Sequence, residues 1–184
     1  FVKTCAIKSF DSLRLVFSDG FWIPELSDFS SLPKGVQLMG LGEALRQTPE
    51  LIIPRLGTAI GQIPHGFAAM NSAFVGDGVF LNVEDNTCID KPIEILFISG
   101  YSGEGFLSLP RNLIVLGDGS SASVVERHIS AESTRVLTNS VTELCLATNA
   151  DLEYINIQNI NDGNLHIQGL FANLGHGARL RSST

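Results

Sequence analysis

The chain has 184 residues, of which 44% are hydrophobic and 17% are charged, a composition that can bury a core without disulfide staples. Its formal net charge is -7, and its 12 lysine and arginine residues form no run, which argues against a nucleic-acid partner. Its apolar stretches are far shorter than the roughly 18 residues of a membrane span, so no membrane association is expected.

The first part of the chain, residues 1–65, predicts a small α+β portion. Alternating apolar residues over 13–17, the turn Asp19-Gly20 and the return over 21–23 predict a hairpin. Residues 40–47 predict a short helix that ends before Pro49. The stretch from Pro49 to Pro64 holds three prolines and predicts an irregular boundary.

Residues 66–184 predict the second unit, the first coils of a stacked β structure. Residues 67–74 can form one or two helical turns, after which 79–83 and 93–98 predict strands. Residues 101–105 predict a glycine-rich loop.

A repeat runs through residues 111–184. Three turns end at Ala122, Ala150 and Ala178, which are 28 residues apart twice over, and a weaker copy lies at 86–88. Each turn stands between an apolar run and an alternating segment, and a fixed period of this length is typical of a solenoid. The pattern predicts a mainly β chain that forms a β-helix, with an antiparallel sandwich as the alternative.

The segment Gly117-Asp118-Gly119-Ser120-Ser121-Ala122 matches the dinucleotide-binding pattern G-x-G-x-x-A. That pattern binds a pyrophosphate only when a helix begins there, because helix N-terminal N–H groups hold the phosphates. The next residues alternate as in a strand. The segment therefore predicts a corner turn rather than a nucleotide site.

Histidines and cysteines are the candidate metal ligands, but they show no ligand spacing. We expect each histidine to be solvated or hydrogen-bonded, and Cys145 to be a buried small hydrophobe. An odd number of distant cysteines predicts no disulfide framework and a reducing compartment, the cytoplasm. The residues concerned are His65, His128, His166, His176, Cys5, Cys88 and Cys145.

Three acids, Glu126, Glu143 and Glu153, raise the possibility of the carboxylate pair of a carbohydrate-active β-helix. In the 28-residue frame Glu126 meets Tyr154 and Glu143 meets Val115, so the acids do not stack. We therefore expect all three on a solvated face. Asparagine and glutamine side chains between 156 and 164 are expected to form polar ladders or loop contacts.

Several runs together resemble the SufB/SufD family of iron–sulfur cluster assembly proteins. The segment 11–17, with Asp19-Gly20 and Pro24, looks like the SufD branch of the family. The other runs are Asn71 to Phe74, Asp77 to Phe80, Lys91 to Ile93, Pro110 to Val115, Glu126, Thr138-Asn139, Thr142-Glu143, Gln158 and His166.

The resemblance implies a right-handed parallel β-helix and a non-catalytic scaffold role in a SufBCD complex, with SufB and SufC as partners. It assigns no catalytic, cofactor or metal residue here, because the family's cluster-related residues and SufC-binding helices follow the part that matches this chain. Since Phe1 is not a start methionine, we expect a piece of a longer protein, whose open last coil could self-associate. The alternative function is a carbohydrate-binding or carbohydrate-active β-helix.

Overall fold

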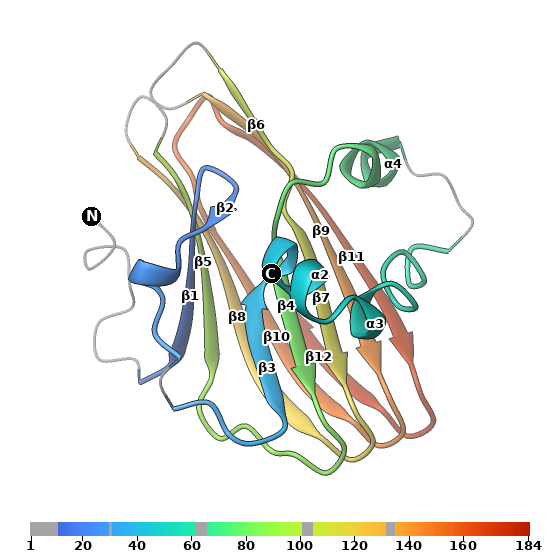
Figure 1. Cartoon of the computed structure of the whole chain (residues 1–184). Coiled ribbons are helices and arrows are strands. Elements are labelled where there is room, and N and C mark those ends of the chain that lie inside the picture. Colours follow the sequence, from blue (N-terminus) through green and yellow to red (C-terminus); the bar gives the residue numbers. More distant parts are fainter. Residues whose placement is uncertain (1–10, 30, 62–65, 101–104, 132–134) are drawn as a thin grey trace.

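The computed structural model describes residues 11–29, 31–61, 66–100, 105–131 and 135–184. These residues form two sheets that pack against each other (Figure 1). Across sheet A the strands are β12 (Arg179–Ser183), β10 (Asp151–Asn159), β8 (Ser121–Ser130), β5 (Ile93–Ser99), β1 (Leu13–Ser18) and β2 (Phe21–Trp22). Across sheet B they are β11 (Leu165–Leu174), β9 (Val136–Leu146), β7 (Arg111–Leu116), β4 (Val79–Val83) and β3 (Val36–Gly40), and β6 (Phe106–Ser108) also pairs with β9.

The chain winds as a parallel β-solenoid of about three turns. From β4 onward, the sheet B strands β4, β7, β9 and β11 each lead through a corner into a strand of sheet A, in order β5, β8, β10 and β12. Neighbouring coils then pair in parallel, as β7 does with β9 and β8 with β10. The predicted β-helix is confirmed, and the antiparallel sandwich is wrong.

The coils are not all the same length. Ser121 pairs with Asp151, 30 residues on, whereas Asp151 pairs with Arg179, 28 residues on. Ala150 therefore stacks over Ser120 rather than Ala122, and the predicted 28-residue frame is wrong for the earlier coil. The offset changes between residues 129 and 137, so the loop from β8 to β9 holds the two additional residues.

The segment 117–122 forms a corner between β7 and β8, as predicted. Gly119 has a φ of 64°, a left-handed conformation that favours glycine, and β8 begins at Ser121 with no helix between. Gly117 is needed for close stacking, because a Cβ there would lie 2.7 Å from the backbone nitrogen of Asp85. The dinucleotide pattern therefore lacks the helix that phosphate binding requires.

The N-terminal residues join both sheets. β1 and β2 form the predicted hairpin, and β1 also pairs in parallel with β5. β3 pairs antiparallel with β4. Residues 1–65 thus contribute strands to each sheet, and a domain boundary at residue 65 stays a prediction.

Three helices lie on the outer face of sheet B (Figure 1): α2 (Leu41–Gln47), α3 (Pro49–Ile52) and α4 (Gly66–Ala73). α2 and α4 confirm the two predicted helices, whereas α3 is an additional turn that begins at Pro49. A short 3₁₀ helix, η1 (Pro24–Leu26), follows β2. We call α2, α3, α4 and the turns over 53–61 the helical cover.

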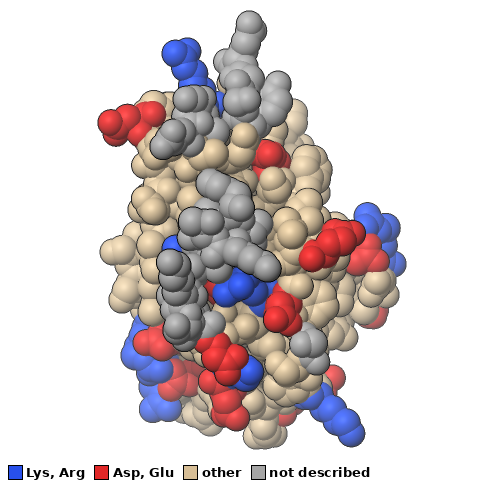
Figure 2. All heavy atoms as spheres, turned by 90° about the vertical axis from the view of Figure 1, so that its left-hand side faces the viewer, with Lys and Arg blue, Asp and Glu red and all other residues tan. Residues whose placement is uncertain are grey.

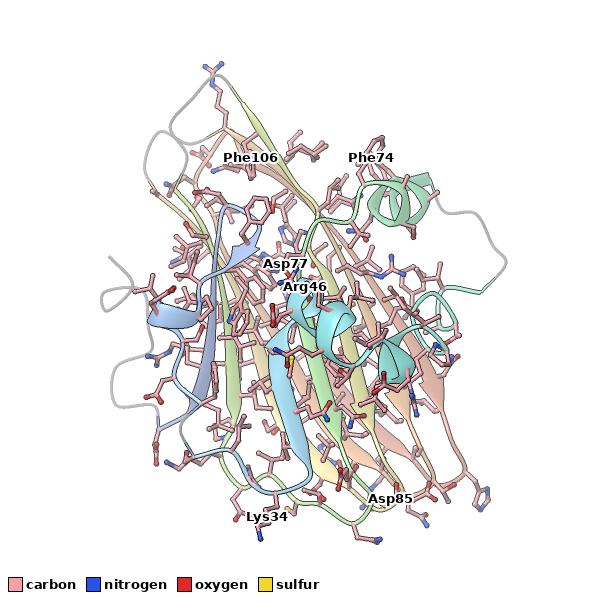
Figure 3. The ribbon with its side chains drawn as sticks, viewed as in Figure 1. Lys34, Arg46, Phe74, Asp77, Asp85 and Phe106 are labelled. Carbon is pink, nitrogen blue, oxygen red and sulfur yellow. The ribbon has the colours of Figure 1, made fainter. Side chains whose placement is uncertain are left out.

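The helical cover is attached by apolar and polar contacts. Leu41 and Ile52 belong to one buried cluster with Phe80 of β4 and Leu113 of β7. Asp77, labelled in Figure 3, accepts hydrogen bonds from the backbone N–H groups of Trp22 at 3.0 Å and Gly42 at 2.9 Å. One carboxylate thus joins the hairpin to the start of α2.

The main core fills the space between the sheets, which we call the lumen. Inward side chains of both sheets form one buried cluster, in which Ile95 and Val124 of sheet A meet Leu81 and Ile114 of sheet B. At an estimated 25 cal/mol per Å² of apolar area buried, such contacts dominate stability. Among the described residues, no helix has both the length and the apolar character needed to cross a membrane.

The side of the molecule that lies at the left of Figure 1 carries charges of both signs. Where described residues form this surface in Figure 2, acidic and basic side chains lie interspersed. Glu94, fully buried, lies between the guanidinium groups of Arg14 at 2.5 Å and Arg127 at 2.9 Å. The described residues of this surface do not form the cluster of cations that a nucleic acid requires.

Candidate functional site

The side chains that β8 places in the lumen change from apolar to polar along the strand. Ala122 and Val124 point inward to the apolar core, and Glu126 and His128 follow on the same face because strand side chains alternate. Glu126 has no exposed surface and His128 has 3%. The lumen therefore has an apolar part and a polar part.

Glu126 is surrounded by donors from both sheets. Its Oε2 accepts hydrogen bonds from the Tyr154 hydroxyl at 2.5 Å, Asn112 Nδ2 at 3.1 Å and the Thr142 hydroxyl at 3.2 Å. Its Oε1 lies 2.7 Å from His128 Nε2. The Ser140 hydroxyl and Gln168 Nε2 each lie 3.4 Å from the same oxygen. We call Asn112, Glu126, His128, Thr142, Tyr154, His166 and Gln168 the lumen cluster.

The environment favours an ionised Glu126. Burial raises its pKa, but the hydrogen bond and charge of His128, with the Tyr154 and Thr142 hydroxyls, outweigh burial and lower the pKa. The pKa of Tyr154 is raised well above its usual value by burial and then by the neighbouring Glu126 charge. Tyr154 therefore stays a hydrogen-bond donor.

Two imidazole rings lie beside the carboxylate. His128 stacks on Phe97 at 4.9 Å between ring centroids, and His166 meets His128 edge-on at 4.4 Å. Burial, followed by the charge of His128, lowers the pKa of His166 to about 4. Neither ring nitrogen of His166 has a hydrogen-bond partner among the described residues.

A cavity of about 310 Å³ adjoins this part of the lumen. Its lining residues come from β10, β11 and the residue after β12: Tyr154, Asn156, Gln158, His166, Gln168, Leu170 and Thr184. Because the oxygens of Glu126 already face several donors, the carboxylate cannot take a proton from a substrate without losing those bonds. Through these contacts the lumen cluster joins the two sheets.

Glu143 is buried on the opposite face of sheet B. It follows Thr142, which faces the lumen, so its own side chain points outward beneath the helical cover. Its Oε1 lies 2.5 Å from Arg111 Nη2 and 2.8 Å from the backbone nitrogen of Gly57. Its Oε2 accepts from the backbone N–H of Ala59 at 3.1 Å.

Arg111 extends this contact to α4. Its Nη1 donates to Asn71 Oδ1 at 3.1 Å and to the Ser72 hydroxyl at 3.0 Å. Asn71 in turn donates to the carbonyl oxygens of Pro110 and Asn139. We call Arg111, Glu143 and Asn71 the cover clamp, because they fix the turns over 53–61 and α4 to sheet B.

The expectation of a solvated face holds for only one of the three acids. Glu153 is exposed and accepts a hydrogen bond from the Ser123 hydroxyl, but Glu126 and Glu143 are both fully buried. The corrected register pairs Glu126 with Asn156 and Glu143 with Leu113. The prediction that the acids do not stack is confirmed. Glu126 points into the lumen, on one side of sheet B, and Glu143 points outward on the other side, so the two form no carboxylate pair.

The remaining candidate ligands are dispersed. His176 is exposed, and Cys5 and His65 lie outside the described residues. Cys88 is exposed, whereas Cys145 is half-buried against the apolar cluster below α2 and α3. In the described part of the chain, no group of three or more histidine, cysteine, aspartate or glutamate residues could hold a metal ion.

The asparagine residues after β10 make loop contacts. Asn161 donates to the carbonyl oxygen of Ala131 at 2.9 Å, and Asn164 Oδ1 accepts from the backbone N–H of Val136 at 2.8 Å. They hold successive loops in register, as the loop-contact alternative predicted. Asn156 instead faces the lumen, where it has 4% exposure.

Comparison with known families matches nearly the whole chain. Residues 2–95 match the SufBD protein N-terminal region, and residues 98–184 match the SufBD core domain of the SUF system for FeS cluster assembly. Both regions contribute strands to the two sheets described above. The two matches cover the chain in the order in which its elements form the solenoid.

Similar proteins carry the same family description. The iron–sulfur cluster assembly SufBD family protein slr0076 of Synechocystis is 27% identical over 91% of this chain and 39% of its own length. The SufBD family protein ycf24 of Pyropia yezoensis is 32% identical over 73% of this chain and 28% of its own length. The chloroplastic ABCI8 of Arabidopsis thaliana is 32% identical over 68% of this chain and 22% of its own length.

The chain thus spans well under half of the length of these relatives. The family resemblance read from the sequence is confirmed by both matched regions. The chain belongs to the SufBD family of iron–sulfur cluster assembly proteins.

Proposed function

We propose that this chain is part of a SufD-like, non-catalytic scaffold subunit of a SufBCD complex. The observation that carries the proposal is the pair of family regions, which together span residues 2–95 and 98–184. The SufD assignment within the family rests on the N-terminal run 11–17 with its Asp19-Gly20 turn.

The arrangement of the buried acids supports a scaffold role. Glu126 joins β8 to β7, β9 and β10, and Glu143 joins sheet B to the helical cover. Both carboxylates are occupied by donors, which favours a structural role over general acid–base chemistry. We further propose SufB and SufC as partners and the cytoplasm as the compartment, where Cys88 and Cys145 would stay free thiols.

Co-purification tests this proposal. The chain, within its complete reading frame, would be co-expressed with the SufB-type and SufC-type proteins of the same genome, with one affinity tag on the chain. We expect a complex that contains all three proteins and whose ATPase activity requires the SufC-type protein. Failure to recover either partner, or nucleotide hydrolysis by the chain alone, would contradict the scaffold role.

The free sheet edges also predict self-association of the 184-residue chain. In the strand order of the described residues, β11 and β12 each have a neighbour on one side only, and β11 is ten residues long. Unpaired edges of this kind recruit further strands. Light scattering should show a mass that rises with concentration, and Ala172→Pro, on β11 and outside the lumen cluster, should reduce that rise because proline interrupts edge pairing. A strict monomer at high concentration would contradict the prediction.

A glycan-binding screen separates the scaffold role from the carbohydrate-related alternative. Sugar sites on solenoids use exposed aromatic or acidic side chains. Trp22 is half-buried and Tyr154 is buried, so neither offers a stacking platform on the surface. We expect no glycan to bind.

A further inference from the structure

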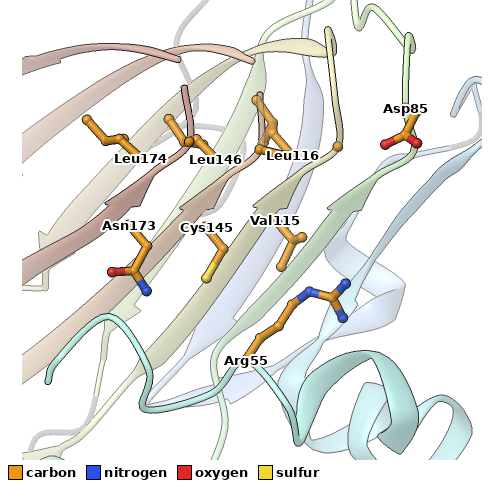
Figure 4. Close-up of a pocket in the computed structure, with 11 residues that line it drawn as sticks. Arg55, Asp85, Val115, Leu116, Cys145, Leu146, Asn173 and Leu174 are labelled. Carbon is orange, nitrogen blue, oxygen red and sulfur yellow. The ribbon is translucent and has the colours of Figure 1, made fainter. Parts of the chain in front are cut away.

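A groove of about 490 Å³ lies on the outer side of sheet B, beside the turn that follows α3 (Figure 4). It lies outside the lumen cluster and the cover clamp. We call it the outer groove, and its volume lies in the range of small-molecule sites. Its lining residues include Arg55, Asp85, Val115, Cys145, Ala147 and Asn173.

The stacking of coils places small residues beside one another at the corners and leaves the outer groove open there. Val115, Cys145 and Asn173 occupy one row across three coils and point toward the turn that carries Arg55 (Figure 4). Two residues later in each coil, the positions are Gly117, Ala147 and Gly175, which lack larger side chains. The row at 115, 145 and 173 is therefore accessible from the side of the corners.

The backbone N–H groups of the three small corner residues already have hydrogen-bond partners. The backbone N–H of Gly117 bonds to Val83, that of Ala147 to Leu116, and that of Gly175 to Leu146, at 2.8, 2.9 and 2.7 Å. An extended peptide would find no strand partner among these N–H groups. Recognition must therefore come from side chains, and the apolar groups of Val115, Ala147 and Leu174 supply contact area.

The charges at the groove are asymmetric. Arg55 donates through Nη1 to the carbonyl oxygen of Leu51 at 2.9 Å, and no ion pair joins its guanidinium to a carboxylate among the described residues. Asp85 lies on the corner side of the groove, against Gly117, where it accepts from the backbone N–H of Asp118 at 2.8 Å. An anion is therefore attracted to the Arg55 end and repelled from the Asp85 end.

We propose that the outer groove binds an apolar monocarboxylate, an aliphatic or aromatic acid whose carboxylate contacts Arg55. Its apolar body lies over the row of Val115 and Cys145 and against the small residues at the corners. The guanidinium is suited to a carboxylate because its planar donors match the two oxygens. This inference does not depend on the proposed scaffold function.

Protection of Cys145 from alkylation tests the site. Octanoate, below its micelle-forming concentration, would be titrated into the protein before reaction with N-ethylmaleimide, and each cysteine-containing peptide would be quantified by mass spectrometry. We expect saturable slowing at Cys145 and no change at Cys88, which is exposed and lies outside the groove. Octanol, which has the same chain without the charge, should protect roughly tenfold more weakly.

Two variants sharpen the result. In Arg55→Gln, octanoate should protect Cys145 no better than octanol does. In Arg46→Gln, on α2 and outside the groove, octanoate should still protect Cys145 better than octanol. Circular dichroism of both variants checks that the fold is retained. Unchanged Cys145 reactivity with octanoate, or equal protection by octanoate and octanol in the parent protein, would overturn the proposal.

Discussion

Two buried glutamates on one solenoid perform different structural tasks. Glu126, inside the lumen, is surrounded by hydroxyl and amide donors and one imidazole, and it joins strands of both sheets. Glu143, outside sheet B, is paired with a guanidinium and two backbone N–H groups, and it holds segments far apart in the sequence. Equal burial therefore does not imply an equal role, because the partners decide what a charge holds together.

The largest expected effect is at the cover clamp. Arg111→Ala leaves Glu143 buried without its cation and leaves Asn71 and Ser72 without their donor. We expect a loss of about 3 to 5 kcal/mol in the free energy of unfolding, measured in urea. The matched control is Arg46→Ala, because the Arg46–Glu43 pair is exposed to solvent and should contribute far less to stability than the buried Arg111–Glu143 pair. A loss below about 1 kcal/mol for Arg111→Ala would refute the assigned role.

A smaller effect is expected in the lumen. Glu126→Gln keeps the shape but turns one acceptor oxygen into an amide donor, which then faces existing donors. We expect a loss of about 1 to 3 kcal/mol in the free energy of unfolding. Since the pKa of Glu126 is lowered in the fold, its contribution is present above the unfolded value of 4.5 and lost as the pH falls through the folded value. Below that range the variant and the parent should converge, and a constant difference at all pH values would contradict this account.

The smallest effect concerns His166. Its folded pKa of about 4 lies below the ordinary 6.5, so the unfolded chain binds a proton first as the pH falls. The contribution of neutral His166 to the free energy of unfolding is fully present above pH 6.5 and declines as the pH falls from 6.5 to about 4. Because His166 is only partly buried, we expect this decline in the free energy of unfolding to be about 1 to 2 kcal/mol.

The pH dependence of unfolding in two variants checks this prediction. His166→Phe should flatten the decline between pH 6.5 and 4 because it removes the titrating group. His176→Gln, an exposed histidine at a corner, serves as the control and should leave the decline unchanged. An equal flattening in both variants would show that His166 is not responsible.

Local patterns in the sequence were sufficient for the elements. The alternation in 13–17, the Asp19-Gly20 turn and the apolar runs before each alanine predicted the hairpin and the coils, since these signals act over a few residues. The family resemblance was equally accessible, because it depends on runs in order. Even the inward position of Glu126 could have been found, since Val124 precedes it on the same strand face.

The register and the partners required the tertiary structure. Two additional residues in the loop between β8 and β9 shift Ala122 away from Ala150, and no local pattern shows where a loop lengthens. The burial of Glu143 depends on turns at 57–59, more than 80 residues earlier in the chain. The sequence alone determined that strands would stack, because periodicity is a local property. Only the folded chain decided which charges would be buried and what would neutralise them, because those contacts join residues that no spacing relates.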